Sequence, residues 1–137
     1  MSATYLCRRG NELSKLQKSA QKSSSVAVEI DEDTAEWDYG GYEGLTTQQI
    51  LERKSDWDMW RDGCPPGAEY PGESPEQMME RVDRVVAKVR AVQKKDLEEQ
   101  QPDESGRDVI IVSHGDFSRA FVARWLNLPL DSWQVSL

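Results

Sequence analysis

The chain contains one histidine, His114, within the segment VIIVSHGDFSRAFVARWL. An apolar run precedes it and an amphipathic run follows, which places His114 in a turn between a buried strand and a helix. In open α/β sheets, ligands bind at the carboxyl ends of strands, where helix N-termini present free N–H groups. A histidine there can hold an anion, act as a general acid or base, or serve as a nucleophile. The alternative is a structural histidine that hydrogen-bonds a neighbouring loop.

A second group of reactive side chains lies in residues 36–44, EWDYGGYEG, where carboxylates and aromatic rings alternate with glycines. Aromatic walls remove water from a carboxyl group and favour its protonated form, which a proton donor requires. The segment has neither helical nor strand periodicity, so it is predicted to be a loop. A surface loop with turn glycines is the alternative interpretation.

Strands and helices alternate around these two groups. Strand patterns are VAVEI (26–30) and RDVIIVS (107–113), with a third candidate at ATYL (3–6) and a fourth beginning at SWQVSL (132–137). Helix patterns cover residues 12–22, 46–54, one turn near 57–62, a long stretch from residue 74, and 116–128. This order predicts an α/β layered fold with parallel strands.

The long helix has the clearest signals. Ser74 can cap it, Pro75 suits the first helical position, and Gln77 has the capping-box spacing. Its apolar residues recur at intervals of three and four, which predicts core packing: Met78, Val82, Val85, Val86, Val89 and Val92. Asp116 is predicted to be the N-cap of the helix that follows His114.

The composition limits the partners. The formal net charge is -8, although residues 1–28 hold five basic side chains and one acid. An acidic body makes nucleic acid and anionic membrane surfaces poor partners, and no segment has the length of a membrane span. Cys7 and Cys64 match no metal-ligand spacing and predict reduced thiols in a cytoplasmic protein. A disulfide between them, or a mitochondrial transit peptide in the basic segment, remains an alternative.

The segments EWDYGGYEGLT, PGES and VIIVSHGDFSRAFVARWL together resemble the histidine phosphatase superfamily, also called phosphoglycerate mutase-like. They are most similar to its fungal sugar phosphatases of the sedoheptulose-1,7-bisphosphatase type, over residues 26–137. The resemblance implies an α/β/α sandwich that transfers a phosphoryl group from a phosphate monoester to a histidine, then to water or a second hydroxyl. It implies no metal and no organic cofactor.

Carried over by position, the resemblance gives each group a role. His114 matches the second histidine of the family, which stabilises the transferring phosphoryl group, and Glu36 matches the proton donor to the leaving oxygen. Tyr39 falls where some relatives contact substrate, and Gly115 matches part of the phosphate cradle. Glu73 of the G-E-S segment matches a structural glutamate. Several relatives have asparagine where this chain has Asp116; an acid facing a phosphate is unfavourable, so its side chain is expected to turn aside and cap its helix.

The family's nucleophile belongs to an R-H-G motif, and this chain has no second histidine. In LCRRG (6–10), Arg9 would take that position, but a guanidinium offers no lone pair for phosphoryl transfer. The favoured interpretation is that Arg8 or Arg9 is the phosphate-binding arginine of a degraded S-P-x-x-R-A-x-x-T motif. Arg9 lies 27 positions before Glu36, close to the family's separation.

We therefore expect a partial three-layer α/β/α sandwich with a mostly parallel sheet, lacking the family's first strand and clipped at both ends. Residues 1–25 would be a divergent basic segment and 26–137 the partial domain. Its function by descent is a phosphatase of phosphorylated sugars or other small phosphate monoesters, with little or no turnover. The alternatives are a non-catalytic module that binds phosphate esters or docks on proteins through its tryptophans, and a mis-assembled gene model of an active enzyme. A homo-oligomer is an open alternative to a monomer.

Overall fold

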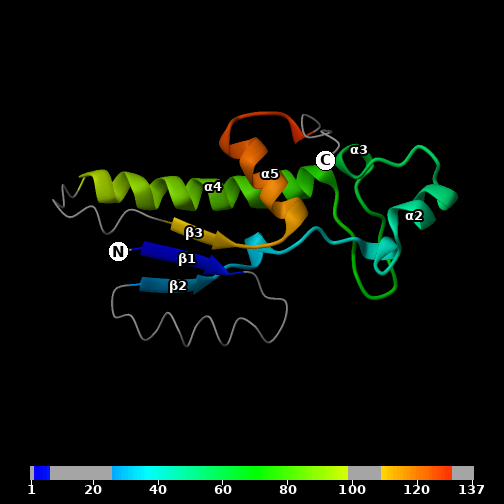
Figure 1. Cartoon of the computed structure of the whole chain (residues 1–137), viewed down its shortest axis with the longest axis horizontal. Coiled ribbons are helices and arrows are strands. Elements are labelled where there is room, and N and C mark those ends of the chain that lie inside the picture. Colours follow the sequence, from blue (N-terminus) through cyan, green and yellow to red (C-terminus); the bar gives the residue numbers. More distant parts are fainter. Residues whose placement is uncertain (1, 7–25, 99–108, 131–137) are drawn as a thin grey trace.

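The computed structural model describes residues 2–6, 26–98 and 109–130. Three parallel strands form its sheet, in the order β2-β1-β3 (Figure 1). They are β1 (Ser2–Leu6), β2 (Val26–Ile30) and β3 (Val109–Val112). The strands predicted at 3–6, 26–30 and 107–113 are thus confirmed, as is the α/β class. The helix predicted at 12–22 and the strand predicted at 132–137 lie outside the described residues.

The long helix α4 (Pro75–Glu98) and the helix α5 (Gly115–Trp125) lie along one side of the strands (Figure 1). β3 turns Val109 and Ile111 toward the core that these helices share, whereas Ile110 and Val112 are 57% and 40% exposed. The connection between β2 and α4 contains two 3-10 turns, η1 (Glu32–Thr34) and η2 (Gly40–Tyr42), and two short helices, α2 (Thr47–Arg53) and α3 (Met59–Asp62). None of the described helices is long and apolar enough to cross a bilayer.

Helix α4 begins as its sequence predicts. The Gln77 N–H donates to Ser74 Oγ at 3.3 Å, and the Ser74 N–H donates to Gln77 Oε1 at 2.8 Å, which completes the capping box. Five residues of the predicted stripe are buried and the sixth, Val92, is partly buried. They pack against α5 through Phe117, Ala120 and Ala123. The stripe is therefore core, as expected.

Two glycine-containing loops interlock beside the end of the sheet. Gly40 has φ +53°, and a Cβ there would lie 2.1 Å from the Pro65 carbonyl oxygen and 2.6 Å from Gly72 Cα. The Gly41 N–H donates to the same carbonyl at 2.7 Å. Any side chain at position 40 would therefore separate the loops, which explains Gly40 of EWDYGGYEG by packing.

The tryptophans of the described residues pack within the chain. Trp37 is fully buried, makes an edge contact with Trp60 at 5.3 Å, and donates its Nε1–H to the Glu73 carbonyl at 3.0 Å. Trp57 packs on Tyr42 in the same way. On α5, Trp125 stacks on Phe121 (centroid distance 5.8 Å). These rings are part of the interior and its margins and do not form an exposed aromatic surface.

Candidate active site

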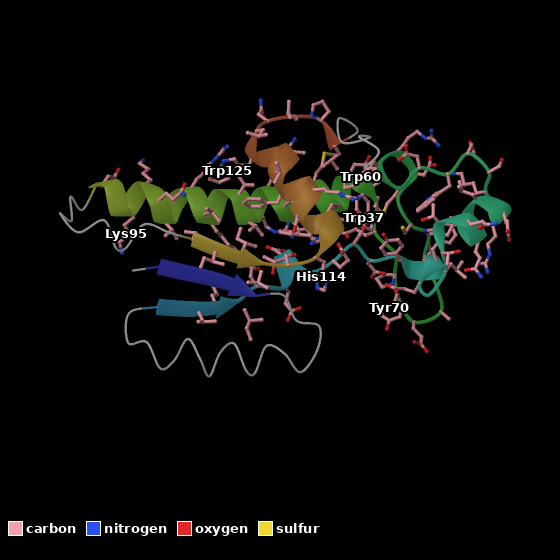
Figure 2. The ribbon with its side chains drawn as sticks, viewed as in Figure 1. Trp37, Trp60, Tyr70, Lys95, His114 and Trp125 are labelled. Atoms are coloured by element: carbon pink, nitrogen blue, oxygen red, sulfur yellow. The ribbon has the colours of Figure 1, made fainter. Side chains whose placement is uncertain are left out.

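His114 stands at the carboxyl end of the sheet, where β3 passes into α5 (Figure 2). It is the N-cap residue of α5, in an extended conformation with φ -108°, and its carbonyl accepts the N–H of Ser118 at 3.0 Å. The preceding residue, Ser113, donates its hydroxyl to the Thr34 carbonyl at 2.6 Å and so ties this turn to η1. No hydrogen bond joins the half-buried His114 imidazole to another described residue. The alternative of a histidine bonded to a neighbouring loop therefore finds no partner in that part of the chain.

Glu36 reaches the same turn from the loop after η1. Its Oε1 accepts the Phe117 N–H at 3.0 Å and the Trp37 N–H at 3.0 Å, and its Oε2 accepts the Asp116 N–H at 3.4 Å. The carboxylate thus caps the first turn of α5 from 80 residues away, where an anion interacts favourably with the helix dipole. The two predicted catalytic groups meet at one helix N-terminus.

The prediction that Asp116 caps α5 is wrong. Asp116 is the second residue of the helix, and its carboxylate accepts the Tyr39 hydroxyl at 2.8 Å and the Arg119 Nη1–H at 3.4 Å. Glu36 already bonds the N–H groups of residues 116 and 117 that a capping side chain would take. The Asp116 side chain instead links α5 to the loop that carries Tyr39.

Gly115 begins α5 and is exposed. A Cβ at this position would meet no heavy atom within 4 Å, so local packing does not require glycine there. Its N–H makes no hydrogen bond within the described part of the chain. The helix therefore keeps an open N–H donor beside His114.

The surroundings of Tyr39 raise the pKa of its hydroxyl well above the ordinary value of 10.0. Burial is the largest cause, followed by the hydrogen bond to Asp116 and the nearby charge of Glu36. Burial and the charge of Asp38 likewise raise the pKa of the Cys64 thiol to about 12. Tyr39 thus stays a hydrogen-bond donor, and Cys64 stays a neutral thiol with little nucleophilic character.

A buried ion pair lies behind the Glu36 loop. Arg81 Nε donates to Glu73 Oε1 at 2.5 Å and Nη2 to Glu73 Oε2 at 2.9 Å, and both side chains are 11% exposed. The family resemblance implies a structural role for Glu73, whereas none of the sequence motifs singles out Arg81. A signal existed, because Arg81 follows Met78 by three positions and precedes Val85 by four on the apolar face of α4.

The last features of this region to consider are its basic side chains and any group that could hold a metal. Arg8 and Arg9 lie outside the described residues. The basic residue that contacts Asp116 is Arg119, whose side chain is 52% exposed. No group of three or more His, Cys, Asp or Glu within residues 2–6, 26–98 and 109–130 is arranged to hold a metal ion.

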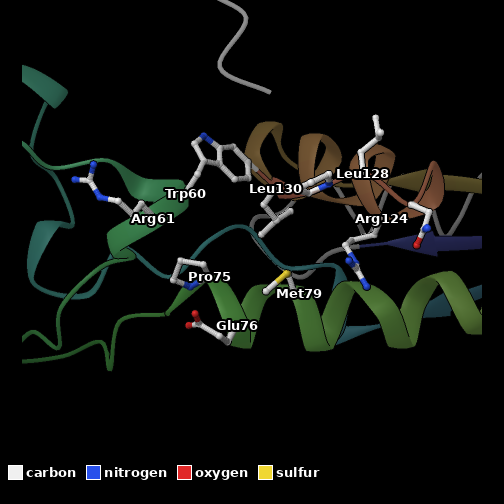
Figure 3. A pocket seen from close by; sticks show the side chains of 10 residues that line it. Trp60, Arg61, Pro75, Glu76, Met79, Arg124, Leu128 and Leu130 are labelled. Atoms are coloured by element: carbon white, nitrogen blue, oxygen red, sulfur yellow. The ribbon is translucent and has the colours of Figure 1, made fainter. Parts of the chain in front are cut away.

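A separate open pocket of about 590 Å³ lies between α3, the start of α4 and the end of α5 (Figure 3). Its walls include Trp60, Met79, Arg124 and Leu130. Neither His114 nor Glu36 lines it, so it is distinct from the turn described above.

The histidine phosphatase superfamily (branch 1) matches residues 13–136. The acid phosphatase of Mycobacterium tuberculosis (strain ATCC 25618 / H37Rv) is 50% identical over 96 residues, which are 70% of this chain and 39% of that protein. The sedoheptulose 1,7-bisphosphatase of Saccharomyces cerevisiae is 33% identical over 118 residues, 80% of this chain and 40% of that protein. The chain thus spans about two fifths of the length of these curated relatives.

Solved structures show the same likeness. The product of the open reading frame Rv3214 of Mycobacterium tuberculosis is 40% identical, with a TM-score of 0.66 over 94% of this chain and 56% of that chain. The mycobacterial glucosyl-3-phosphoglycerate phosphatase Rv2419c, 23% identical, has a TM-score of 0.60 over 96% of this chain and 61% of that chain, and shows the fold alone.

Proposed function

The chain belongs to the histidine phosphatase superfamily, and from that premise we propose that it binds small phosphate monoesters at the start of α5 without appreciable turnover. One observation carries this proposal: the Glu36 carboxylate bonds the first turn of α5 directly after His114 and Gly115. Two groups that the family uses for phosphate chemistry are thereby neighbours, although 78 positions separate them. Phosphorylated sugars are the favoured ligand class, because relatives include a sedoheptulose 1,7-bisphosphatase.

Each residue has a proposed role in binding. An imidazolium at His114 would neutralise phosphoryl oxygens, and the Gly115 N–H at the helix N-terminus would donate to one of them. Glu36 would lie near the ester oxygen, at the position of the family's proton donor to the leaving alcohol. Tyr39 would contact the rest of the ligand, and Arg9 would supply a second cationic contact with the phosphate.

Turnover is expected to be low because the sequence has no second histidine and residues 2–6, 26–98 and 109–130 offer no replacement for the missing nucleophile. His114 is the only histidine and stabilises the phosphoryl group in this account. A guanidinium such as Arg9 has no lone pair to attack phosphorus. Burial keeps Cys64 protonated, so a thiolate does not take the role either.

The finer architecture is also a proposal: a partial α/β/α sandwich that lacks the family's first strand, with residues 26–137 as the partial domain. In support, β3 pairs with β1 along one edge, and its other edge has no strand partner among the described residues. The exposed Ile110 and Val112 side chains fit an uncovered sheet face. Strand β1 (Ser2–Leu6) pairs with both other strands, so the sheet of this partial domain would also include the first residues of segment 1–25, at its centre.

The test combines ligand binding with phosphate release. Calorimetric titration with inorganic phosphate and sedoheptulose bisphosphate should show saturable binding that His114→Ala abolishes and Glu52→Gln, on the exposed surface of α2, preserves. No phosphate should be released from sedoheptulose bisphosphate or p-nitrophenyl phosphate. Release that His114→Ala abolishes would overturn the absence of turnover, and a chain that binds neither ligand would overturn the binding role.

A further inference from the structure

All three nitrogens of the Arg81 guanidinium donate hydrogen bonds, and two of them bond the segment that carries Glu36. Besides its two bonds to Glu73, Nη1 donates to the carbonyls of Asp33 at 2.9 Å and Ala35 at 2.7 Å, and Nη2 to the Glu36 carbonyl at 3.3 Å. Three backbone carbonyls within four residues are thus fixed by one side chain from α4. A lysine could not replace this planar set of donors.

Glu73 fixes the residues on the other side of Glu36. Its Oε2 accepts the Asp38 N–H at 3.3 Å, and its backbone carbonyl accepts the Trp37 Nε1–H at 3.0 Å. The Glu73–Arg81 pair therefore holds the backbone of residues 33–38 from both sides. Between these points, the Glu36 side chain is free of the pair and its carboxylate accepts the N–H groups of Asp116 and Phe117 in α5.

The same arginine also touches the helix that receives the carboxylate. The Arg81 guanidinium lies 5.6 Å from the centroid of the Phe117 ring, and the Phe117 N–H is the donor to Glu36 Oε1. Arg81 thus contacts both the residue that supplies the carboxylate and the residue that receives it.

We propose that Arg81 and Glu73 are a positioning pair that sets the Glu36 carboxylate against the first turn of α5, next to His114. The importance of this role for ligands rests on the proposed function, but the placement itself does not. A buried ion pair often adds little net stability compared with apolar residues of the same volume. Its use here is consistent with fixing a geometry, because its bonds converge on the six residues around Glu36.

Amide hydrogen exchange, measured by NMR on the full chain, tests the placement directly. The Phe117 and Asp116 amides report whether the Glu36 carboxylate is in place, and Glu36→Ala gives the exchange expected without it. Arg81→Met should speed exchange of the Phe117 amide by about tenfold or more relative to Val85 within α4. Arg84→Met is the matched control, since Arg84 lies on the same helix and pairs with Asp33 but is 56% exposed. It should leave the ratio unchanged.

A double variant separates positioning from a general structural role. If Arg81 acts through Glu36, Arg81→Met should add nothing to the local exchange already seen in Glu36→Ala. The proposal would be overturned if the effects of Arg81→Met and Glu36→Ala on amide exchange were additive in the double variant. It would also be overturned if Arg81→Met accelerated exchange equally at Phe117 and Val85. If Arg81→Met does not fold, Arg81→Lys keeps the charge but not the fork of donors, and it should give the same local loss; unchanged exchange in that variant would also overturn it.

Phosphate titration of the same samples distinguishes this inference from the proposed function. Local loss at Phe117 in Arg81→Met supports the positioning pair whether or not wild-type chain binds inorganic phosphate. Failure of wild-type chain to bind phosphate would overturn the proposed function alone.

Discussion

Replacing Glu36 with alanine removes the acceptor for two N–H groups in the first turn of α5 and for the Trp37 N–H. Loss of an N-cap acceptor costs about 0.5–2 kcal/mol, and a hydrogen bond to a charged group contributes about 1.5–3 kcal/mol. Glu36 is half-buried, so water can reach part of the vacated site, which keeps the loss well below the sum of these ranges and near the values that they share. We expect Glu36→Ala to lower the free energy of unfolding by about 2 kcal/mol.

Thermal unfolding followed by circular dichroism measures this loss. For a chain of this length, 2 kcal/mol corresponds to a Tm lower by roughly 5–8 °C. Glu36→Gln keeps one amide oxygen as an acceptor and should lose less than half as much. Glu52→Ala, on the exposed surface of α2, is the control and should stay within about 0.5 kcal/mol of wild type.

The reasoning would be refuted if Glu36→Ala melted within about 2 °C of wild type under the same conditions. It would also be refuted if Glu52→Ala lost as much stability as Glu36→Ala. Either result would mean that the carboxylate does not hold the start of α5 in solution.

Three further predictions concern the same region and the chain as a whole. Asp116→Asn removes a negative charge at the start of α5 and should tighten inorganic phosphate binding by roughly threefold in calorimetry; weaker binding would contradict the charge argument. Because burial raises the pKa of Cys64 from 9.0 to about 12, the stability that its protonated thiol contributes is full below pH 9 and falls as pH rises through that window. Urea unfolding at pH 8 and pH 10 should therefore show a larger alkaline loss for wild type than for Cys64→Ala, and equal losses would count against it. A partial domain should be marginally stable, so a sharp cooperative melt above about 60 °C would speak against the missing strand.

Local signals predicted the parts of the fold that depend on local sequence. Helix α4 carries its cap, its first-turn proline and a regular apolar stripe, and all of them take the predicted places. Strands β1, β2 and β3 are short β-branched or aromatic runs that the sequence also identifies. Their order in the sheet could not be read in the same way, because it depends on pairing between segments about 100 positions apart.

In the site, too, local sequence predicts the separate segments but not the contacts between them. The sequence patterns identify both the loop of Glu36 and the turn of His114 as segments that carry reactive side chains, but neither pattern contains their contact. Capping rules consider only nearby residues and therefore predict Asp116 as the cap of α5, whereas the distant Glu36 carboxylate takes that place. The role of Arg81 could not be predicted for a related reason. It depends on three backbone carbonyls in a loop more than 40 positions away.

The most direct test of the central claim is an NMR titration of the ¹⁵N-labelled full chain with p-nitrophenyl phosphate, with ³¹P spectra recorded on the same samples. Binding at the start of α5 predicts saturable shifts of the Gly115 and Asp116 amide signals, their absence in His114→Ala, and a ³¹P signal of intact ester throughout. Unmoved Gly115 and Asp116 signals would contradict the binding site. Growth of an inorganic phosphate signal that His114→Ala prevents would contradict the absence of turnover.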